Sequence, residues 1–225
     1  MILRSDLKTA SWSFWTSLIF IGILASLHIL KSKIDPSWNF ISEYQVGAFG
    51  WLMSLAFLSL AMSCIFLSLA LWRELNIAGK IGIIMLMLSA IGMIIAAIFK
   101  TDPLDTSPEL VTQSGKLHQL GAMLDQIPFA AILISIALFR KKGWQVNRWS
   151  LIIALILVWF GFIYFVASIR AQFPADGKFG PNVLVGWQNR IMIVTQALWL
   201  IIVSKEVNKM TATINKHSGF IKQFE

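Results

Sequence analysis

Long apolar stretches and short polar segments alternate along the whole chain. Each apolar stretch is about 20 residues long, which is the length that a helix needs to cross the ~30 Å hydrocarbon core of a bilayer. The apolar stretches are residues 12–30, 48–71, 81–99, 120–139, 149–169 and 183–203. We therefore predict an all-α, polytopic membrane protein, a bundle of six transmembrane helices that forms a single domain over residues 1–225. No part of the sequence remains for a soluble domain.

The composition supports a membrane protein and argues against one that binds nucleic acid. Hydrophobic residues make up 57% of the chain and charged residues only 13%, whereas a soluble domain carries roughly 25% charged residues. The formal net charge is +8, but the basic residues flank the apolar stretches, where they orient the protein and contact anionic lipid. We expect membrane lipids as partners and no nucleic acid.

The basic residues are distributed unevenly between the two sides of the predicted bundle. Of the 19 Lys and Arg residues, 12 lie in the two terminal segments and in residues 72–80 and 140–148, and 7 lie on the other side. Because positively charged segments tend to stay in the cytoplasm, both termini should be cytoplasmic. Residues 31–47, 100–119 and 170–182 would then face outward.

Two charged residues lie within the predicted spans. Asp125 belongs to the stretch 120–139 and Arg190 to the stretch 183–203. At 1.5 Å of rise per residue, both lie about 7–9 Å below the outer hydrocarbon boundary. A charge at this depth costs a few kcal/mol unless it is paired, so we predict an ion pair between Asp125 and Arg190 if their spans are neighbours. Such a pair could line a polar cavity, or it could only fix the register of the helices.

Further polar residues gather at the same level or above it. His118 precedes Asp125 by two helical turns, so both should face the same way. Pro128 removes a backbone donor and frees the carbonyl of Leu124, so we expect a kink in the helix beside Asp125. The cytoplasmic halves of the six spans hold no charged residue, which favours a pocket that is open to the outside and closed below. The candidate binding residues are Arg190, Asp125, His118, Glu43, Asp102, Asn189, Gln188 and His28.

We expect this pocket to bind or handle a lipid headgroup or a small amphiphilic molecule. Arg190 would hold an anionic group, because a guanidinium suits phosphate or carboxylate. Asp125 would be its counter-charge in the empty pocket, and His118, Glu43 and Asp102 would line the entrance. The sequence is compatible with an oligomer.

Three other functions remain open. His118 with Asp125 or Asp102 could form the acid/base pair of a membrane-embedded hydrolase or acyltransferase. His28 and His118 could ligate a haem iron in a redox protein. The chain could also be a structural or partner subunit. Catalytic zinc normally takes three protein ligands, and because only these two His residues lie near the spans we predict no metal site and no cofactor.

Several short motifs resemble a known family. Residues 39–44 read Asn-Phe-Ile-Ser-Glu-Tyr, residues 98–103 read Ile-Phe-Lys-Thr-Asp-Pro, Gly115 precedes His118 by three positions, and the last span begins with polar residues that include Arg190. Over about residues 12–203 the chain resembles the bacterial membrane family known as domain of unknown function 998, which usually has Pro in place of Lys100. The resemblance implies a protein of six or seven membrane helices, placed in the bacterial inner membrane, with no assigned reaction. It singles out Glu43, Asp102, His118 and Arg190.

Overall fold

The computed structural model describes residues 4–141, 146–174 and 177–221. Throughout these residues the chain forms seven α-helices and two short 3₁₀ helices, with no strand. In chain order the elements are α1 (Arg4–Leu30), η1 (Ile41–Gln45), α2 (Gly50–Leu71), α3 (Ile77–Ile98), η2 (Pro108–Leu110), α4 (Gln113–Met123), α5 (Ile127–Arg140), α6 (Arg148–Gln172) and α7 (Gly186–Ile221). Two of the basic residues used in the orientation argument, Lys142 and Lys222, lie outside the described residues.

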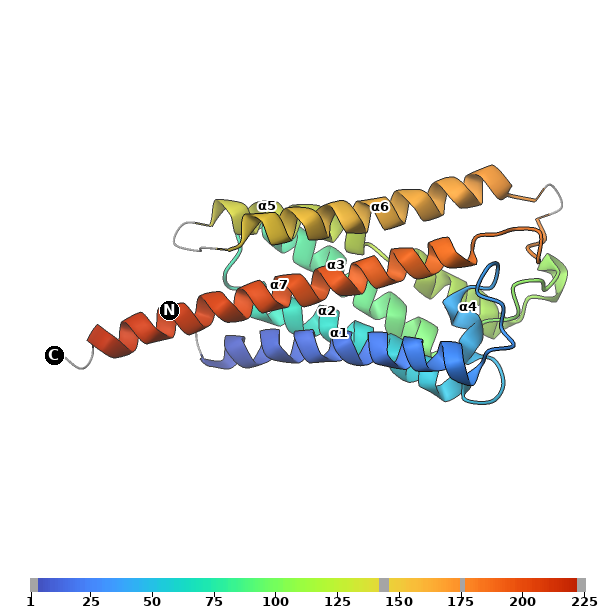
Figure 1. The fold of residues 1–225 in the computed structure, drawn as a ribbon, viewed down its shortest axis with the longest axis horizontal. Coiled ribbons are helices and arrows are strands. Elements are labelled where there is room, and N and C mark those ends of the chain that lie inside the picture. The colour runs from blue at the N-terminus through green and yellow to red at the C-terminus, as the bar shows by residue number, and fades with distance from the viewer. Residues whose placement is uncertain (1–3, 142–145, 175–176, 222–225) are drawn as a thin grey trace.

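Six helical segments are long and apolar enough to cross a membrane. They are Lys8–Leu30, Gly50–Leu71, Ile77–Ile98, Gln113–Arg140, Arg148–Gln172 and Gly186–Met210. Each corresponds to one predicted stretch, so the predicted multi-pass, all-α architecture is confirmed. The start of α1 and the end of α7 lie at the same end of the bundle, which we call the terminal end (Figure 1). The opposite end carries residues 31–49, 99–112, 173–174 and 177–185, and we call it the loop end.

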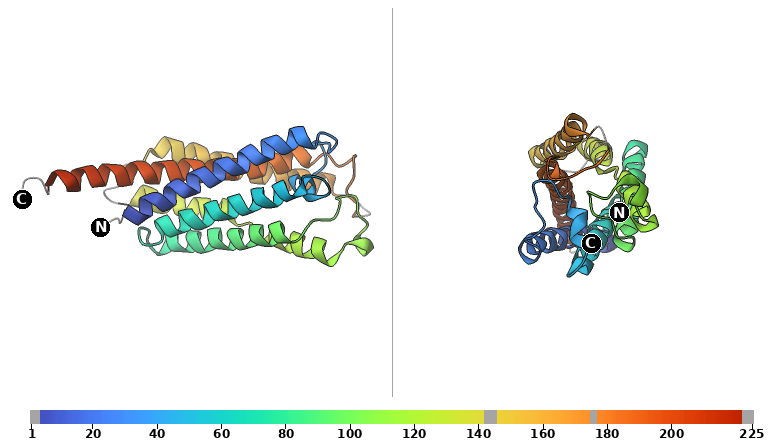
Figure 2. Two further views of the ribbon diagram at one scale, coloured as in Figure 1. Left: turned by 90° about the horizontal axis from the view of Figure 1, so that it is seen from below. Right: turned by 90° about the vertical axis from the view of Figure 1, so that its right-hand side faces the viewer.

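The six spans form a closed ring. α1 packs on α2, α2 on α3, α3 on α4 and α5, α5 on α6, and α6 on α7, which in turn packs against α1. The end-on view in Figure 2 shows the helices around the bundle axis. The fourth span therefore consists of two consecutive helices, α4 and α5, and both lie against α3.

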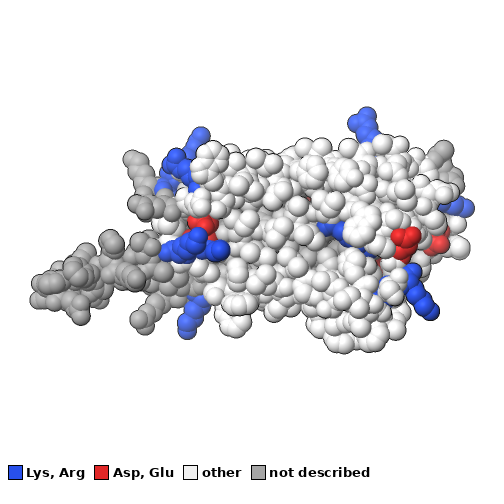
Figure 3. Space-filling model, viewed as in Figure 1, with Lys and Arg blue, Asp and Glu red and all other residues white. Residues whose placement is uncertain are grey.

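The helices differ in how much of their surface the bundle covers. In the most apolar part of α7, 56% of the residues are buried, against 17% in α6. The exposed face of α6 carries Trp149, Ile153, Ile156 and Phe160 at helical spacing, which is the pattern of a face turned to lipid tails. On the face shown in Figure 3, charged side chains gather toward the two ends of the bundle, and the surface between them carries few Lys, Arg, Asp or Glu residues.

A buried hydrogen-bond network joins three helices near the terminal end. Ser63 of α2 contacts Ser13 and Ser17 of α1, with Oγ–Oγ distances of 2.9 and 2.6 Å. Ser204 of α7 donates to Ser13 Oγ at 2.8 Å. None of the four side chains has exposed surface. Because an unpaired hydroxyl is costly in an apolar environment, these serines hold α1, α2 and α7 together as interhelical polar contacts.

The fourth span is interrupted between Met123 and Ile127. The kink expected at Pro128 is thus a full break of the helix. Pro128 lies in the first turn of α5, where a missing N–H is harmless because the first helical N–H groups have no intrahelical partner. Just before the break, the backbones of α3 and α4 touch: a Cβ added to Gly121 would lie 2.5 Å from the carbonyl oxygen of Gly92.

Replacing Gly121 with Ala should therefore destabilise the protein, because the new methyl group meets the backbone of α3. Overpacking of this kind costs about 1–3 kcal/mol. The matched control is Gly22→Ala, the same change in a helix where nothing lies within 4 Å of the new Cβ. Thermal unfolding of the purified protein should give a lower melting temperature for Gly121→Ala alone. Equal melting temperatures in the two variants would contradict the close contact between α3 and α4.

Candidate functional site

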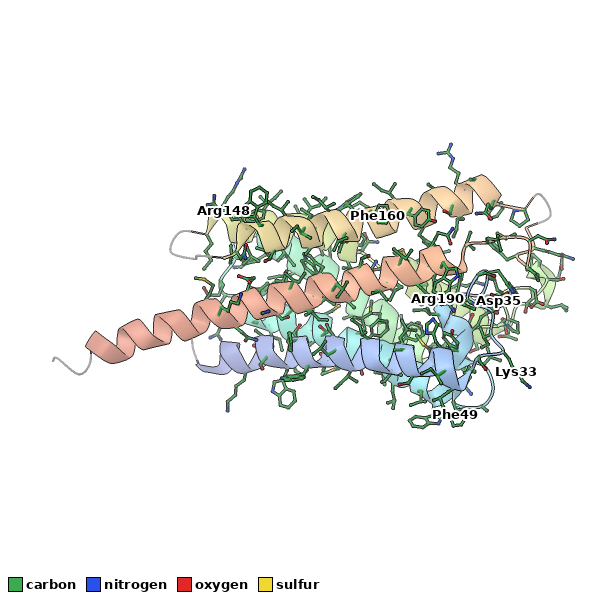
Figure 4. The ribbon with its side chains drawn as sticks, in the orientation of Figure 1. Lys33, Asp35, Phe49, Arg148, Phe160 and Arg190 are labelled. Carbon is green, nitrogen blue, oxygen red and sulfur yellow. The ribbon has the colours of Figure 1, made fainter. Side chains whose placement is uncertain are left out.

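Arg190 lies in the first turns of α7, and only 3% of its surface is exposed. Its guanidinium donates to five acceptors: His28 Nε2 (2.9 Å), Tyr44 Oη (3.2 Å) and the carbonyl oxygens of Pro36 (3.2 Å), Asn39 (2.6 Å) and Gly186 (3.0 Å). It also lies over the rings of Tyr44 and Trp187, at 5.4 and 5.8 Å from their centroids. Arg190 thereby ties α1, the first loop, η1 and α7 into one unit (Figure 4).

This arrangement gives Arg190 structural contacts that the sequence analysis did not predict, and its predicted role in binding an anionic group stays a prediction. A guanidinium has five N–H donors, and here they are directed at protein acceptors in a buried position. Little donor capacity remains for an anionic ligand. Gly186 is part of the same contact, because a Cβ at this position would lie 2.5 Å from the carbonyl oxygen of Pro36. Arg190 is therefore a structural anchor of the loop end.

Asp125 has different partners from Arg190, so the predicted ion pair between them is wrong. Its Oδ1 accepts the N–H of Ile127 at 3.0 Å and its Oδ2 accepts from Gln196 Nε2 at 2.7 Å. Gln196 follows Arg190 by six residues, or about 9 Å of helix. The depth calculation assumed straight, uninterrupted helices, and the break at residues 124–126 places Asp125 nearer the middle of α7. Asp125 caps α5 and links it to α7.

His118 and Asp102 have different hydrogen-bond partners, and no hydrogen bond joins the two in the described part of the chain. His118 is buried, its Nδ1 lies 3.1 Å from the carbonyl oxygen of Ala96 and 2.8 Å from that of Phe99, and its ring packs edge-on against Phe57. Asp102 instead accepts from the backbone N–H (2.8 Å) and Oγ1 (3.0 Å) of Thr112. His118 thus fastens the end of α3 and Asp102 fastens the start of α4. Neither carboxylate proposed for the hydrolase or acyltransferase contacts His118.

The two histidines predicted as haem ligands belong to separate networks. His28 Nδ1 lies 2.8 Å from the carbonyl oxygen of Leu24, and its Nε2 accepts from Arg190. Both ring nitrogens of His28 are therefore engaged, and His118 is held against α3. In residues 4–141, 146–174 and 177–221, no group of three or more His, Cys, Asp or Glu residues is placed to hold a metal ion.

Of the remaining candidate residues, Asn189 and Glu43 bond backbone groups of the loop end, whereas Gln188 is more exposed. Asn189 is buried, and its Oδ1 accepts the N–H of Ile41 at 3.1 Å. Glu43 is buried, and its Oε1 accepts the N–H of Leu104 at 2.7 Å. Gln188 is only half-buried and is not among the acceptors of Arg190. The candidate binding residues thus do not form one hydrogen-bond network. Arg190, His118 and Asp125 each belong to a separate network, which we name after these residues.

The loop end contains a cavity of about 490 Å³, which we call the loop-end pocket. Its polar lining includes Lys31, Lys33, Asn39 and Glu43. Its apolar lining includes Leu30, Ile34, Val46, Phe49 and Pro103. Figure 4 shows Lys33 and Phe49 at this end of the bundle. Of the predicted site residues, only Glu43 lines the loop-end pocket.

Charge in the loop-end pocket is distributed over one carboxylate and two lysines. Glu43 Oε2 is buried and has no hydrogen-bond partner within the described structure. Burial raises the pKa of Glu43, and the N–H of Leu104 opposes this shift only in part. Lys31 donates to the carbonyl oxygens of Tyr44 (2.8 Å) and Val46, and burial lowers the pKa of its ammonium group.

The family model described as Protein of unknown function (DUF998) matches residues 15–205. The chain belongs to this family. The match runs from α1 to α7 and so includes all three polar networks and the loop-end pocket. No curated protein and no solved structure matches the chain. The function of this DUF998 protein therefore has to be argued from its geometry.

Gln45 is a structural anchor of this DUF998 chain that the sequence analysis missed. It has no exposed surface, and its Nε2 contacts Ser54 Oγ (2.9 Å) and the carbonyl oxygens of Ala96 (2.9 Å) and Ala97 (3.1 Å). These bonds tie η1 to the ends of α2 and α3. The available signal was its position directly after Tyr44, at the end of the motif that carried the family resemblance.

Asp125→Asn and Arg190→Gln should act independently on stability, because the two side chains share no partner. Arg190→Gln removes hydrogen bonds from a charged donor, each worth about 1.5–3 kcal/mol. In a double-mutant cycle measured by unfolding in detergent, the double variant should equal the sum of the single variants within about 0.5 kcal/mol. Arg170→Gln, at an exposed position, is the control and should be near neutral. A clear favourable coupling between positions 125 and 190 would restore the predicted ion pair.

Proposed function

We propose that this protein binds the headgroup of a membrane amphiphile in the loop-end pocket, with the loop end facing outward from the bacterial inner membrane. The headgroup would carry an anionic group together with a hydrogen-bond donor, of which an ammonium is the simplest case. The observation that carries the proposal is the buried, unpartnered Glu43 Oε2 in a pocket that also holds Lys31 and Lys33.

The lysines supply the anionic half of this recognition. Lys33 is exposed and lines the pocket, so its ammonium is available to a phosphate or carboxylate. Lys31 uses two of its three N–H groups to hold the carbonyls of Tyr44 and Val46. Its charge is thereby fixed in position at the pocket wall.

Glu43 supplies the complementary half. Its Oε1 is held by Leu104, which orients the carboxylate and leaves Oε2 for another donor. A buried acceptor without a donor is costly, and a ligand ammonium or hydroxyl would satisfy it. The positive charge of Arg190 lowers the pKa of Glu43 to a small extent and so opposes the effect of burial. None of the five acceptors of Arg190 named above belongs to Glu43.

The position and apolar wall of the pocket suit a molecule anchored in the bilayer. The first span ends at Leu30 and the second begins at Gly50, so the pocket lies where lipid headgroups meet the hydrocarbon core. Leu30 and Phe49 line the pocket and are 48% exposed each. Phe49 has a left-handed backbone with φ of 60°, which is uncommon for a residue other than Gly. Ligand sites typically combine such apolar walls with a few polar groups.

The other functions considered from the sequence receive less support. An acid/base pair needs a carboxylate within hydrogen-bond reach of His118, and the contacts of Asp102 and Asp125 lie elsewhere. A structural role accounts well for Arg190, His118 and Gln45. It leaves the unpartnered oxygen of Glu43 unexplained.

Lys33→Gln should reduce the amount of lipid that stays bound during purification. A partly exposed ion pair is worth up to about 1 kcal/mol, so the loss should reach up to about fivefold. Native mass spectrometry of the purified wild type and variants measures the lipid-bound fraction. Lys100→Gln is the matched control, since Lys100 is an exposed lysine of the loop end outside the pocket. Equal lipid retention in the wild type and both variants would overturn the proposal.

Glu43→Gln should weaken binding of phosphatidylethanolamine, which carries a phosphate and an ammonium, by about tenfold or 1.4 kcal/mol. The Gln amide oxygen can still accept the N–H of Leu104, so the pocket should keep its shape. Burial raises the pKa of Glu43, and the ammonium requires the ionised carboxylate. In the wild type, binding should therefore strengthen as the pH rises through that raised pKa, and in Glu43→Gln it should not. Titration of protein in nanodiscs measures this, with phosphatidylglycerol as the lipid that lacks the ammonium. The same pH dependence in both proteins would remove Glu43 from the site.

A further inference from the structure

The break in the fourth span holds a second polar site, separate from the loop-end pocket. Asp125 lies between the end of α4 and the start of α5, and it is half-buried. One carboxylate oxygen accepts the N–H of Ile127 and the other accepts from Gln196 of α7. The next residue is held as well, since the N–H of Gln126 donates to Ser89 Oγ of α3 at 2.7 Å. The carboxylate is thus fixed among three helices.

The charge of this carboxylate is poorly compensated. Arg190, the predicted counter-ion, is directed at His28, Tyr44 and the loop carbonyls. The N-terminal end of α5 favours a negative charge, but the C-terminal end of α4 at the same place opposes it. An ionised carboxylate at membrane depth costs a few kcal/mol, and a buried group of this kind tends to neutralise itself by binding a proton.

Gln196 shows an independent sign of an incomplete site. Its side chain has no exposed surface, and its Nε2 donates to Asp125 Oδ2 at 2.7 Å. The Oε1 of the same amide has no hydrogen-bond partner among the described residues. An ionised carboxylate can only accept hydrogen bonds, whereas a protonated one also has an O–H to donate. The unpartnered oxygen therefore sits on the very group that already contacts Asp125.

We infer that Asp125 and Gln196 form an intramembrane proton-binding site that links the fourth span to α7. A proton from water bonds to Oδ1 of Asp125, and this O–H donates to Gln196 Oε1, while Nε2 continues to donate to Oδ2. The result is an acid–amide pair with two hydrogen bonds in place of one, and the carboxyl group loses its charge. Oδ1 keeps a lone pair for the N–H of Ile127. No electron transfer or other reactant is involved.

The surroundings of Asp125 contain few other groups that could titrate in its place. On α2, the electrostatic neighbour of Asp125 is the buried thiol of Cys64. The facing groups on α3 and α7 are Ser89 and Gln196, which do not ionise. α6 packs against α5 but has no acidic residue, and its ionisable residues are confined to Arg148, Tyr164 and Arg170. A proton that binds at the break in the fourth span is therefore assigned to Asp125.

Infrared spectroscopy of the full-length protein in nanodiscs tests this inference through the carbonyl stretch of a protonated carboxylic acid. The wild type should show this band, and its intensity should fall as the pH is raised. Asp125→Asn should lose the part of the band that Asp125 contributes and keep the part from other buried carboxyl groups such as Glu43, and Asp105→Asn, at an exposed loop position, should leave the band unchanged. Gln196→Met removes both hydrogen bonds of the acid–amide pair while keeping a long side chain, and should shift the acid band to higher wavenumber, because the carbonyl group no longer accepts the N–H of the amide.

Three results would overturn the inference. The first is the absence of an acid band assignable to Asp125 at every pH at which the protein stays folded. The second is an unchanged position of the acid band in Gln196→Met, which would leave the amide without a role. The third is a midpoint that moves when Na⁺ is replaced by choline at constant ionic strength, which would identify a metal cation as the ligand. Because Gln196→Met keeps Asp125, the test does not depend on how well Asp125→Asn folds.

Discussion

The hydrocarbon core offers no water to an unpaired polar group, and the position of nearly every buried polar side chain in this protein follows from that constraint. Ser13, Ser17, Ser63 and Ser204 satisfy one another across three helices. His118 forms hydrogen bonds with carbonyl groups at the end of α3, and Asp125 accepts a hydrogen bond from an N–H at the start of α5. Arg190 donates to carbonyls of the first loop. Apart from the serines, each of these side chains bonds a backbone group that a helix end or a loop would otherwise leave unpaired.

The same constraint makes the exceptions informative. Two buried oxygens without a partner in the described structure belong to residues that already hold one firm hydrogen bond: Glu43 and Gln196. One lies in a pocket at the loop end with two lysines, and the other lies beside an intramembrane carboxylate. In each of the two residues, one atom is held by a hydrogen bond and a second atom has no partner. Both proposals rest on this arrangement, because a ligand could bind the second atom with little reorganisation of the side chain. The chemistry of the neighbours favours an amphiphile headgroup at the first site and a proton at the second.

The two sites occupy different levels and use different helices. The loop-end pocket is built from the end of α1, the first loop and η1, whereas the Asp125 site is built from α4, α5 and α7. η1 contributes Glu43 to the loop-end pocket and is hydrogen-bonded to α3 through Gln45 and to α7 through Asn189. The Arg190 anchor holds the loop end in shape from α7, the helix that also contributes Gln196. α7 is thus the element that both sites share, directly or through its contacts.

Apolar length and the lack of charge were enough to establish six spans, a single bundle and a helix disturbance near Pro128, because these depend on local sequence and on the solvent alone. The same reasoning identified Arg190, Asp125, His118, Glu43 and Asp102 as residues that must have partners. It did not identify the partners. Rise per residue determines the depth of a side chain in an unbroken helix, but not the direction in which it points or the offset caused by a break. Only the tertiary packing decided that Asp125 meets Gln196, that Arg190 meets His28 and the loop carbonyls, and that Glu43, unlike the other four, lines the loop-end pocket.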